Sequence, residues 1–203
     1  MKRLNIIGAS GHGKVVADIA RLNGYDDIVF FDDNGSIKSC GGIKVAGNVG
    51  AALESNGDFF IAIGKSQIRE HMMKRFEGRF FPSLVHPGAV VAGDVKIGEG
   101  SLVAAGAVVN PGASIGRGCI INTCASADHD CNVSDFVHIA VGAHLSGSVS
   151  VGQRTWICVG ASVVNNITIC ADCVVGAGAV VIKDITEPGT YAGVPAKLLH
   201  GVG

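Results

Sequence analysis

The residues from Val85 to Val181 follow a repeat of six, in which one position is nearly always a branched aliphatic side chain. Four residues later a second position is nearly always small, with Ile167 as the bulky exception. This period fits neither an α-helix nor a simple alternating strand. It is typical of hexapeptide-repeat β-helices. The large positions are Val85, Val91, Ile97, Val103, Val109, Ile115, Ile121, Ala127, Val133, Ile139, Leu145, Val151, Ile157, Val163, Ile169, Val175 and Val181.

The repeat also predicts how these positions are arranged in space. Three hexads form one coil of about 18 residues, and strands of successive coils pair about 4.8 Å apart. We expect the chain to turn where glycine directly follows a large position, at Gly98, Gly116, Gly152 and Gly176. A coil without insertions has no loop that could cover an active site. We therefore expect any site to lie between subunits.

The first eighty residues show a different pattern, in which short apolar runs alternate with helical periodicity. A glycine-rich turn over residues 8–13 follows the first run. Strands that alternate with helices predict a small parallel α/β domain of Rossmann-like βαβ type. The expected strands are residues 4–7, 28–31 and 59–63, and the expected helices are residues 14–23 and a helix from Ser66 with Ile68, Met72 and Phe76 on one face.

Charge and composition divide the chain and exclude some functions. Residues 1–84 hold 11 of the 16 Lys and Arg residues, so we expect a domain boundary near Pro82, with domains at 1–82 and 83–203. The net charge of −1 gives no sign of nucleic acid or a membrane surface as partner. Apolar runs are too short to span a membrane or form a signal peptide, so we expect a cytoplasmic protein.

The seven cysteines predict packing, with no metal site. Cys119, Cys131 and Cys173 occupy the small position of the repeat, where cysteine acts as a small apolar residue. Cys170 and Cys173 have the spacing of a redox or zinc motif, but Cys173 belongs to the core. We therefore expect no metal, and no disulfide in a cytoplasmic protein.

The glycine-rich turn allows two interpretations. Its glycines at 8, 11 and 13 do not follow the G-x-G-x-x-G order, and a tight strand-to-helix turn alone would explain them. A nucleotide phosphate held by backbone N–H groups would explain them too. His12 inside the turn favours a ligand. Residues 10–12, Asp32, Asp33 and Gly64 all follow strands, at the edge where α/β sheets bind ligands.

Candidate chemistry in the coil lies where the repeat is weakest. His129 and Asp130 follow the undersized Ala127, and His138 and His144 come soon after. A coil needs no histidine for its core, and a carboxylate beside an imidazole raises its basicity, as general-base catalysis requires. No serine-nucleophile motif and no complete set of metal ligands is present. The pattern favours direct group transfer with a base.

In its motifs, the chain resembles the bacterial sugar acetyltransferases of the PglD/NeuD group over essentially its whole length. This resemblance implies that the coils form a left-handed parallel β-helix. Relatives of this group acetylate nucleotide-linked amino sugars or sialic acids. The matching motifs, in order, are residues 8–13, Phe31-Asp32-Asp33, Ile63-Gly64, Asn122-Thr123, Asp128-His129-Asp130, His138 and Gly193-Val194-Pro195-Ala196-Lys197.

The resemblance also implies a role for each matching residue. His129 corresponds to the general base, and Asp130 to the acid that raises its basicity. The positions implied to contact acetyl-CoA are His138, Gly147 through its N–H, Val159 and Ala177. The positions implied to bind the nucleotide sugar, in the domain at residues 1–82, are Ser10, Gly11, His12, Asp32, Asp33 and Gly64.

We therefore expect a homotrimeric, acetyl-CoA-dependent N-acetyltransferase of glycan biosynthesis, acting on the 4-amino group of a UDP-linked amino-dideoxy sugar. Two alternatives remain open. The same His–Asp pair would serve O-acetylation of sialic acid or another sugar hydroxyl. A hexapeptide-repeat protein without catalytic activity, used as a scaffold, is the second alternative, and the His129–Asp130 pair disfavours it.

Overall fold

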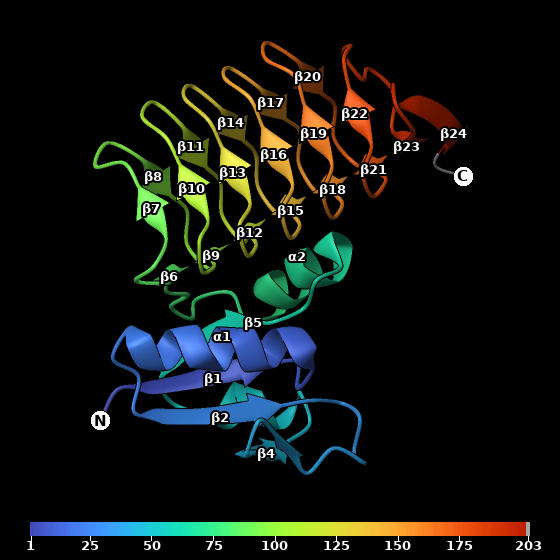
Figure 1. Cartoon of the computed structure of the whole chain (residues 1–203). Helices are drawn as coiled ribbons and strands as arrows, with labels where there is room; N and C mark the ends of the chain where they lie inside the picture. The colour runs from blue at the N-terminus through green and yellow to red at the C-terminus, as the bar shows by residue number, and fades with distance from the viewer. Residues whose placement is uncertain (202–203) are drawn as a thin grey trace.

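The computed structural model describes residues 1–201 and shows two parts stacked on one another (Figure 1). An α/β part contains the N-terminus, and a parallel β-helix extends from β6 to the C-terminal strands. This confirms the fold expected from the hexapeptide repeat and from the strand–helix alternation. The expected boundary at residue 82 lies between α2 and β6. Among the described residues, no helix combines the length and the apolar character that crossing a membrane requires.

The α/β part is a five-stranded sheet in the order β3-β4-β2-β1-β5. The expected strands and helices are present, and β3 and β4 are additions that the sequence pattern did not predict. The α1 helix begins at Gly11, earlier than the expected residue 14, because Ser10 is its N-cap. The strands are β1 (Arg3–Ile7), β2 (Asp27–Phe31), β3 (Ser39–Cys40), β4 (Ile43–Gly47) and β5 (Asp58–Ile61), and the helices are α1 (Gly11–Leu22), α2 (Ser66–Arg75) and the 3₁₀ helix η1 (Ala51–Glu54).

The β-helix has three sheets, and the chain visits them in turn. The covered sheet, which faces the α/β part, contains β6 (Leu84–Val85), β9 (Leu102–Val103), β12 (Ile120–Ile121), β15 (His138–Ile139), β18 (Trp156–Ile157), β21 (Val174–Val175), β23 (Gly189–Ala192) and β24 (Lys197–Gly201). The front sheet, nearer the viewer in Figure 1, contains β7 (Val90–Val91), β10 (Val108–Val109), β13 (Ser126–Ala127), β16 (His144–Leu145), β19 (Ser162–Val163) and β22 (Val180–Val181). The rear sheet contains β8 (Lys96–Ile97), β11 (Ser114–Ile115), β14 (Asn132–Val133), β17 (Ser150–Val151) and β20 (Thr168–Ile169).

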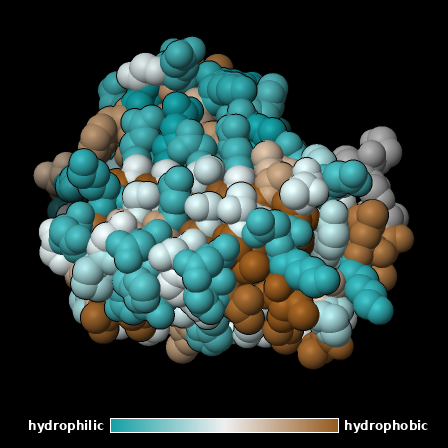
Figure 2. All heavy atoms as spheres, turned by 90° about the horizontal axis from the view of Figure 1, so that it is seen from above, coloured by the Kyte–Doolittle hydropathy of each residue, from teal (hydrophilic) through white to brown (hydrophobic). Residues whose placement is uncertain are grey.

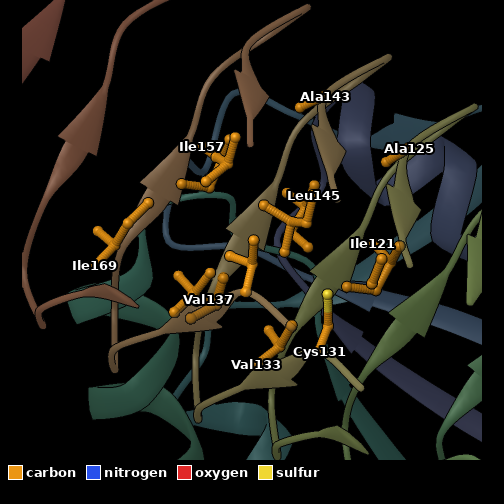
Figure 3. Close-up of a cluster of buried hydrophobic side chains, with 14 of the residues drawn as sticks. Ile121, Ala125, Cys131, Val133, Val137, Ala143, Leu145, Ile157 and Ile169 are labelled. Carbon is orange, nitrogen blue, oxygen red and sulfur yellow. The ribbon is translucent and has the colours of Figure 1, made fainter. Parts of the chain in front are cut away.

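The large positions of the repeat form the interior of the β-helix. Those from Val103 to Val181 are all buried in one cluster, and Figure 3 shows several of them pointing into the space between the sheets. Equivalent residues of successive coils pair in parallel, as Ile121 does with Val103 and Ile139. Cys119, Cys131 and Cys173 are buried in the same cluster, as expected from their small positions.

The glycines that follow large positions have a different role from the expected one. Left-handed backbone occurs elsewhere in the hexad, for example at Gly100 and at Asp130. Gly98 and Gly152 instead allow close contact between coils, because a Cβ on either would lie 2.4 Å from a backbone nitrogen of the next coil. At these positions it is the close spacing of the coils, and not the turn, that requires glycine.

The two parts pack through the outer face of the covered sheet. Leu84, Leu102 and Ile120 are almost fully buried there, in one cluster with core residues of the α/β part such as Val16. His138 and Trp156 follow Ile120 along the same face, as the repeat predicts. The α/β part therefore lies against one side of the triangular coil, and the corner between the front and rear sheets lies on the opposite side.

Candidate active site

His129 and Asp130 form a hydrogen-bonded pair at the corner between β13 and β14. The Nδ1 atom of His129 lies 2.8 Å from Oδ2 of Asp130. Asp130 occupies a left-handed turn position, with φ of 58°, which aspartate tolerates better than most residues. The hydrogen bond that Nδ1 donates to Asp130 raises the pKa of His129, and the charges of Asp128 and Asp130 add to this effect. With Nδ1 turned to the carboxylate, Nε2 is the atom that can accept a proton.

Asp128 holds the backbone of this corner in place. Its Oδ1 accepts hydrogen bonds from Asn110 Nδ2 at 2.6 Å and from the backbone N–H of His129 at 2.8 Å. These bonds lower the pKa of Asp128, with the Asn110 bond contributing most. Asp128 therefore stays ionised and adds a second negative charge beside His129.

Two glycines make room for the pair. A Cβ on Gly147 would lie 2.4 Å from His129 Nε2, and a Cβ on Gly112 would lie 2.4 Å from Asp130 Oδ1. The proton-accepting nitrogen of His129 thus lies directly against the backbone of Gly147, one coil further along. Among the described residues, no carbonyl accepts the Gly147 N–H, which leaves it able to donate to a ligand. The predicted base and the predicted backbone donor are therefore adjacent.

His138 lies on the covered sheet, almost buried, and its ring stacks on Trp156 with an interplanar angle of 4°. Asn122 Oδ1 accepts the N–H of Thr123 at 2.8 Å, which orients the amide so that Nδ2 donates to His138 Nε2 at 3.2 Å. Nε2 is then an acceptor, and Nδ1 carries the hydrogen. Burial, together with the charge of Arg69, lowers the pKa of His138 to about 3. His138 is therefore neutral at pH 7 and unsuited to act as a base.

The glycine-rich turn contains two kinds of glycine. Gly8 and Gly13 are required by packing, because a Cβ on Gly13 would lie 2.4 Å from the Gly8 carbonyl oxygen and one on Gly8 would lie 2.9 Å from that of Ala62. Gly11 and Gly64 have open space where a side chain would be, and neither has left-handed backbone. The tight turn thus explains only some of these glycines, and the space in front of Gly11 and Gly64 can accept a ligand.

His12 lies beside this space and is largely buried. Burial, together with the smaller effect of the Arg69 charge, lowers the pKa of His12 to about 4. Its Nε2 is buried without a hydrogen-bond partner, as is Nδ1 of His138. Two neutral histidines, one from each part of the molecule, therefore each have a buried ring nitrogen without a hydrogen-bond partner.

Asp32 and Asp33 organise the backbone at the ends of the strands. Asp32 accepts hydrogen bonds from the N–H groups of Ala9 at 2.7 Å and of Asn34 at 2.8 Å. Asp33 accepts one from the N–H of Val49 at 2.9 Å. Both carboxylates border a cavity of about 200 Å³, which is also lined by Ile7, Gly8, Val49, Ile63, Ile68 and Met72.

Within one chain the predicted site residues form separate groups. His129, Asp130 and Gly147 share the corner between the front and rear sheets, whereas the glycine turn and His138 lie at the covered sheet. Val159 and Ala177 occupy equivalent positions of successive coils at a third place, the corner between the covered and front sheets. His144 is exposed on the front sheet and bonds Ser126 Oγ at 2.9 Å.

The sequence repeat predicted Trp156 beside His138, but the sequence gave no sign of Arg69 as a neighbour of the site. The helical face expected for α2 is also partly wrong: Met73 and Phe76 are buried, but Ile68 is 41% exposed, and Arg69 is buried instead. The reason is that α2 packs against the β-helix as well as against its own sheet. Among the described residues, no three His, Cys, Asp or Glu side chains converge as metal ligands would.

The sequence matches two known family profiles. Residues 3–76 match the family described as PglD N-terminal domain, and residues 83–111 match that described as bacterial transferase hexapeptide (six repeats). Both matches agree with the division of the chain into an α/β part and a coil.

Solved structures match the whole chain. The acetyltransferase domain of PglB from Neisseria gonorrhoeae FA1090 is 41% identical, with a TM-score of 0.93 over 98% of this chain and 100% of that chain, and it has also been solved with acetyl coenzyme A. PerB from Caulobacter crescentus, in complex with CoA and GDP-perosamine, is 36% identical, with a TM-score of 0.92 over 98% of each chain. WeeI from Acinetobacter baumannii AYE is 28% identical, with a TM-score of 0.91 over 98% of this chain and 100% of that chain.

Proposed function

This chain belongs to the family of PglD-type bacterial sugar acetyltransferases, and we propose that it transfers the acetyl group of acetyl-CoA to the 4-amino group of a UDP-linked amino-dideoxy sugar. Relatives solved with acetyl coenzyme A, or with CoA and GDP-perosamine, support a thioester donor and a nucleotide-sugar acceptor. Membership of an enzyme family leaves the scaffold alternative without support.

The observation that carries this proposal is the contact between His129 and Gly147. Direct acyl transfer needs a base for the attacking amine and a donor for the developing oxyanion within a few ångströms of the same carbonyl carbon. His129 Nε2 lies against the Gly147 backbone. Within residues 1–201, the Gly147 N–H donates no hydrogen bond to a backbone carbonyl. These two groups would act on one carbonyl at the same time.

The reaction then follows from these groups. The neutral amine attacks the thioester carbonyl, and His129 Nε2 accepts the amine proton. Asp130 stabilises the resulting imidazolium through the hydrogen bond at Nδ1. The Gly147 N–H donates to the oxyanion until the carbon–sulfur bond breaks. The thiolate of CoA leaves and takes up a proton, and the products are the amide and free CoA.

The acceptor would be held by the α/β part. Backbone N–H groups at the start of α1, near Ser10 and Gly11, suit a diphosphate. The cavity beside Asp32 and Asp33 would receive the base and ribose. His12 and Gly64 border the way from this cavity to His138, where the sugar and the acetyl group would meet.

This arrangement requires two copies of the chain. The acceptor site lies at the covered sheet, whereas His129 lies on the opposite side of the coil, so one chain cannot bring its own base to its own acceptor. His138 follows His129 by half a coil, and Gly147 follows His129 by one full coil, so all three lie at a similar height along the axis. Copies with parallel axes would place the His129 corner of one beside the His138 of the next, and a closed ring of three satisfies every site.

Exposed apolar residues of the β-helix support this assembly. Val159 and Ile182 are about half exposed, and Val194 is 74% exposed. In the view from above, hydrophobic residues gather toward the C-terminal end of the molecule (Figure 2). Such a surface suits a neighbouring copy and the pantetheine arm of CoA between them. Val159 and Ala177 would contact that arm.

Thiol release from acetyl-CoA, with mass analysis of the product, tests the proposal. The acceptors would be a UDP-linked 4-amino sugar, GDP-perosamine, and sialic acid as a hydroxyl acceptor. We expect acetyl incorporation on the UDP-amino sugar, with loss of turnover in His129→Ala. Preferred acetylation of a hydroxyl would establish the O-acetyltransferase alternative, and preference for GDP-perosamine would correct the nucleotide.

A further inference from the structure

Arg69 is a buried cation at the junction of the two parts of the molecule. It lies in the second turn of α2 and is 1% exposed. Its Nη1 donates to the carbonyl oxygens of Ile63 and Gly64, both at 2.8 Å. Its Nε donates to Gly118 at 2.6 Å and its Nη2 to Phe136 at 2.8 Å, which are equivalent positions of successive coils. One side chain therefore joins the end of β5 to two coils of the β-helix.

The stability of the interface does not explain this residue. Taking a charge out of water costs several kcal/mol, and an apolar side chain of similar size often stabilises a protein more. Among the described residues no carboxylate forms an ion pair with Arg69, so only neutral groups, the four carbonyls and the Ser66 hydroxyl, compensate its charge. Burial lowers the pKa of Arg69 to about 10, which leaves it charged at pH 7. The free energy needed to bury this charge indicates that Arg69 has a role beyond holding the two parts of the molecule together.

The carbonyls that Arg69 holds belong to the proposed site. Ile63 lines the cavity beside Asp32 and Asp33, and Gly64 faces the open space near His12 and His138. A shift of this segment would move the acceptor relative to the acetyl group, and misplacement by about 1 Å can cost about 10²-fold in rate.

We propose that Arg69 is a positioning residue for acetyl transfer: it fixes the Ile63–Gly64 segment against the coils at Gly118 and Phe136, and so sets the place of the acceptor relative to the donor. This inference rests on the proposed function. Lysine cannot replace arginine here, because a single ammonium group cannot reach four carbonyls in a planar fork.

The charge of Arg69 has a second effect on the same site. Arg69 opposes protonation of both His12 and His138. The charged or titratable groups that act on His138 are Arg69 and His12, and Arg69 also acts on His12. The other neighbours of the His138 ring, Asn122, Trp156 and the Gly64 backbone, are uncharged. The Cys119 thiol also lies near Arg69, and burial raises its pKa to about 12, so it stays neutral. The acceptor therefore meets two neutral imidazoles.

Two substitutions separate the geometric role from the charge. Arg69→Lys keeps the charge but loses most of the hydrogen bonds, and Arg69→Met loses both. Arg154→Met is the matched control, because Arg154 also joins α2 to the coil, through Glu70 at 3.2 Å and Asp172 at 2.6 Å. Arg154 is partly exposed, and Arg69, not Arg154, is the arginine that lowers the pKa values of His12 and His138. Kinetics with each substrate, thermal unfolding and NMR titration of the histidines, assigned with His12→Gln and His138→Gln, would be measured.

We expect kcat/KM for the nucleotide sugar to fall by about 10²-fold in both Arg69 variants, with the KM for acetyl-CoA little changed. In Arg69→Met the pKa values of His12 and His138 should rise toward their ordinary range, whereas Arg69→Lys should leave them low. Arg154→Met should leave both properties near wild type.

Folded Arg69 variants with wild-type kcat/KM for the nucleotide sugar would overturn the proposal. The proposal would also be overturned if kcat/KM fell equally for both substrates and fell by the same factor in Arg154→Met. Such a result would indicate a general loosening of the interface. If Arg69→Met does not fold, Arg69→Lys decides the positioning role. A wild-type chain that acetylates no nucleotide sugar would refute the proposed function, and the histidine titration would still judge the effect of the charge.

Discussion

His129 has an imidazole whose two nitrogens have separate tasks. Nδ1 is committed to Asp130 and Nε2 lies against Gly147, so the ring can accept a proton in one direction only. His138 has the opposite character, because burial, together with the charge of Arg69, keeps it neutral. These environments favour His129 over His138 as the proposed base.

The first prediction concerns the carboxylates beside the base. His129→Ala should lower kcat by about 10²–10⁴-fold, the usual range for loss of a general base. Asp130→Asn should lower the pKa of His129, because the hydrogen bond that His129 donates to the Asp130 carboxylate is the main cause that raises this pKa. The base form then persists to more acidic conditions, so the acidic limb of the pH–rate profile should move to lower pH.

Asp128→Asn is the control for this experiment. Asp128 affects the pKa of His129 through its charge alone. The acidic limb of the pH–rate profile should therefore move less in Asp128→Asn than in Asp130→Asn. A larger shift in the Asp128 variant would show that the pairing of His129 with Asp130 has been misassigned.

The second prediction concerns Gly147. In Gly147→Ala the new methyl group would lie 2.4 Å from His129 Nε2 and must displace the imidazole. We expect kcat to fall by about 10²-fold without loss of the fold. Gly93→Ala is the matched control, because Gly93 occupies the same position of an earlier coil and a Cβ there meets nothing within 4 Å. Steady-state kinetics of both variants would check this, and equal activities would show that the contact has no role.

At the scale of elements, the strand ends and the start of α1 form the proposed acceptor site. Asp32 uses both carboxylate oxygens on backbone N–H groups, so it shapes the turn and is not free to hold a ligand through those bonds. His12 instead has a buried ring nitrogen without a hydrogen-bond partner. The two residues therefore contribute in different ways to one site.

The third prediction follows from this division. His12→Ala and Asp32→Ala should raise the KM for the nucleotide sugar by about tenfold or more, as the loss of a buried hydrogen bond or of turn order implies, and should leave that for acetyl-CoA nearly unchanged. Asp18→Ala, on the exposed side of α1, should change neither value. Initial-rate measurements that vary one substrate at a time decide this, and equal changes in both constants would mean that the α/β part does not hold the acceptor alone.

The elements also show what a sequence pattern can predict. The hexad repeat predicted every interior position from Val103 to Val181, because each coil repeats the same packing requirement. It did not predict β3 and β4, which are short strands around the Gly41–Gly42 turn. Arg69 was not predicted either, because a cationic residue in a helix normally faces solvent. Its partners Gly118 and Phe136 lie 49 and 67 residues away and offer only backbone oxygens.

For the whole molecule, the central feature is that the α/β part and the His129 corner lie on opposite sides of the coil. The sequence alone suggested a site between subunits, and the order of the three sheets now gives the physical reason. We expect the chain to form a homotrimer, which light scattering of the purified protein would show. A fully active monomer would contradict a site built between subunits.

A direct test combines two impaired chains and measures turnover with the nucleotide sugar well below its KM. His129→Ala lacks the base and His12→Ala lacks part of the acceptor site, so each homotrimer should be impaired. Co-expressed with different tags and purified as mixed trimers, they should regain activity, because a site built from the His129 corner of one copy and the α/β part of the next contains no substitution. Each mixed trimer contains one such site, which is about a third of its sites. Recovery toward that level is the predicted result, and mixed trimers no more active than the parent variants would show that one chain supplies both groups.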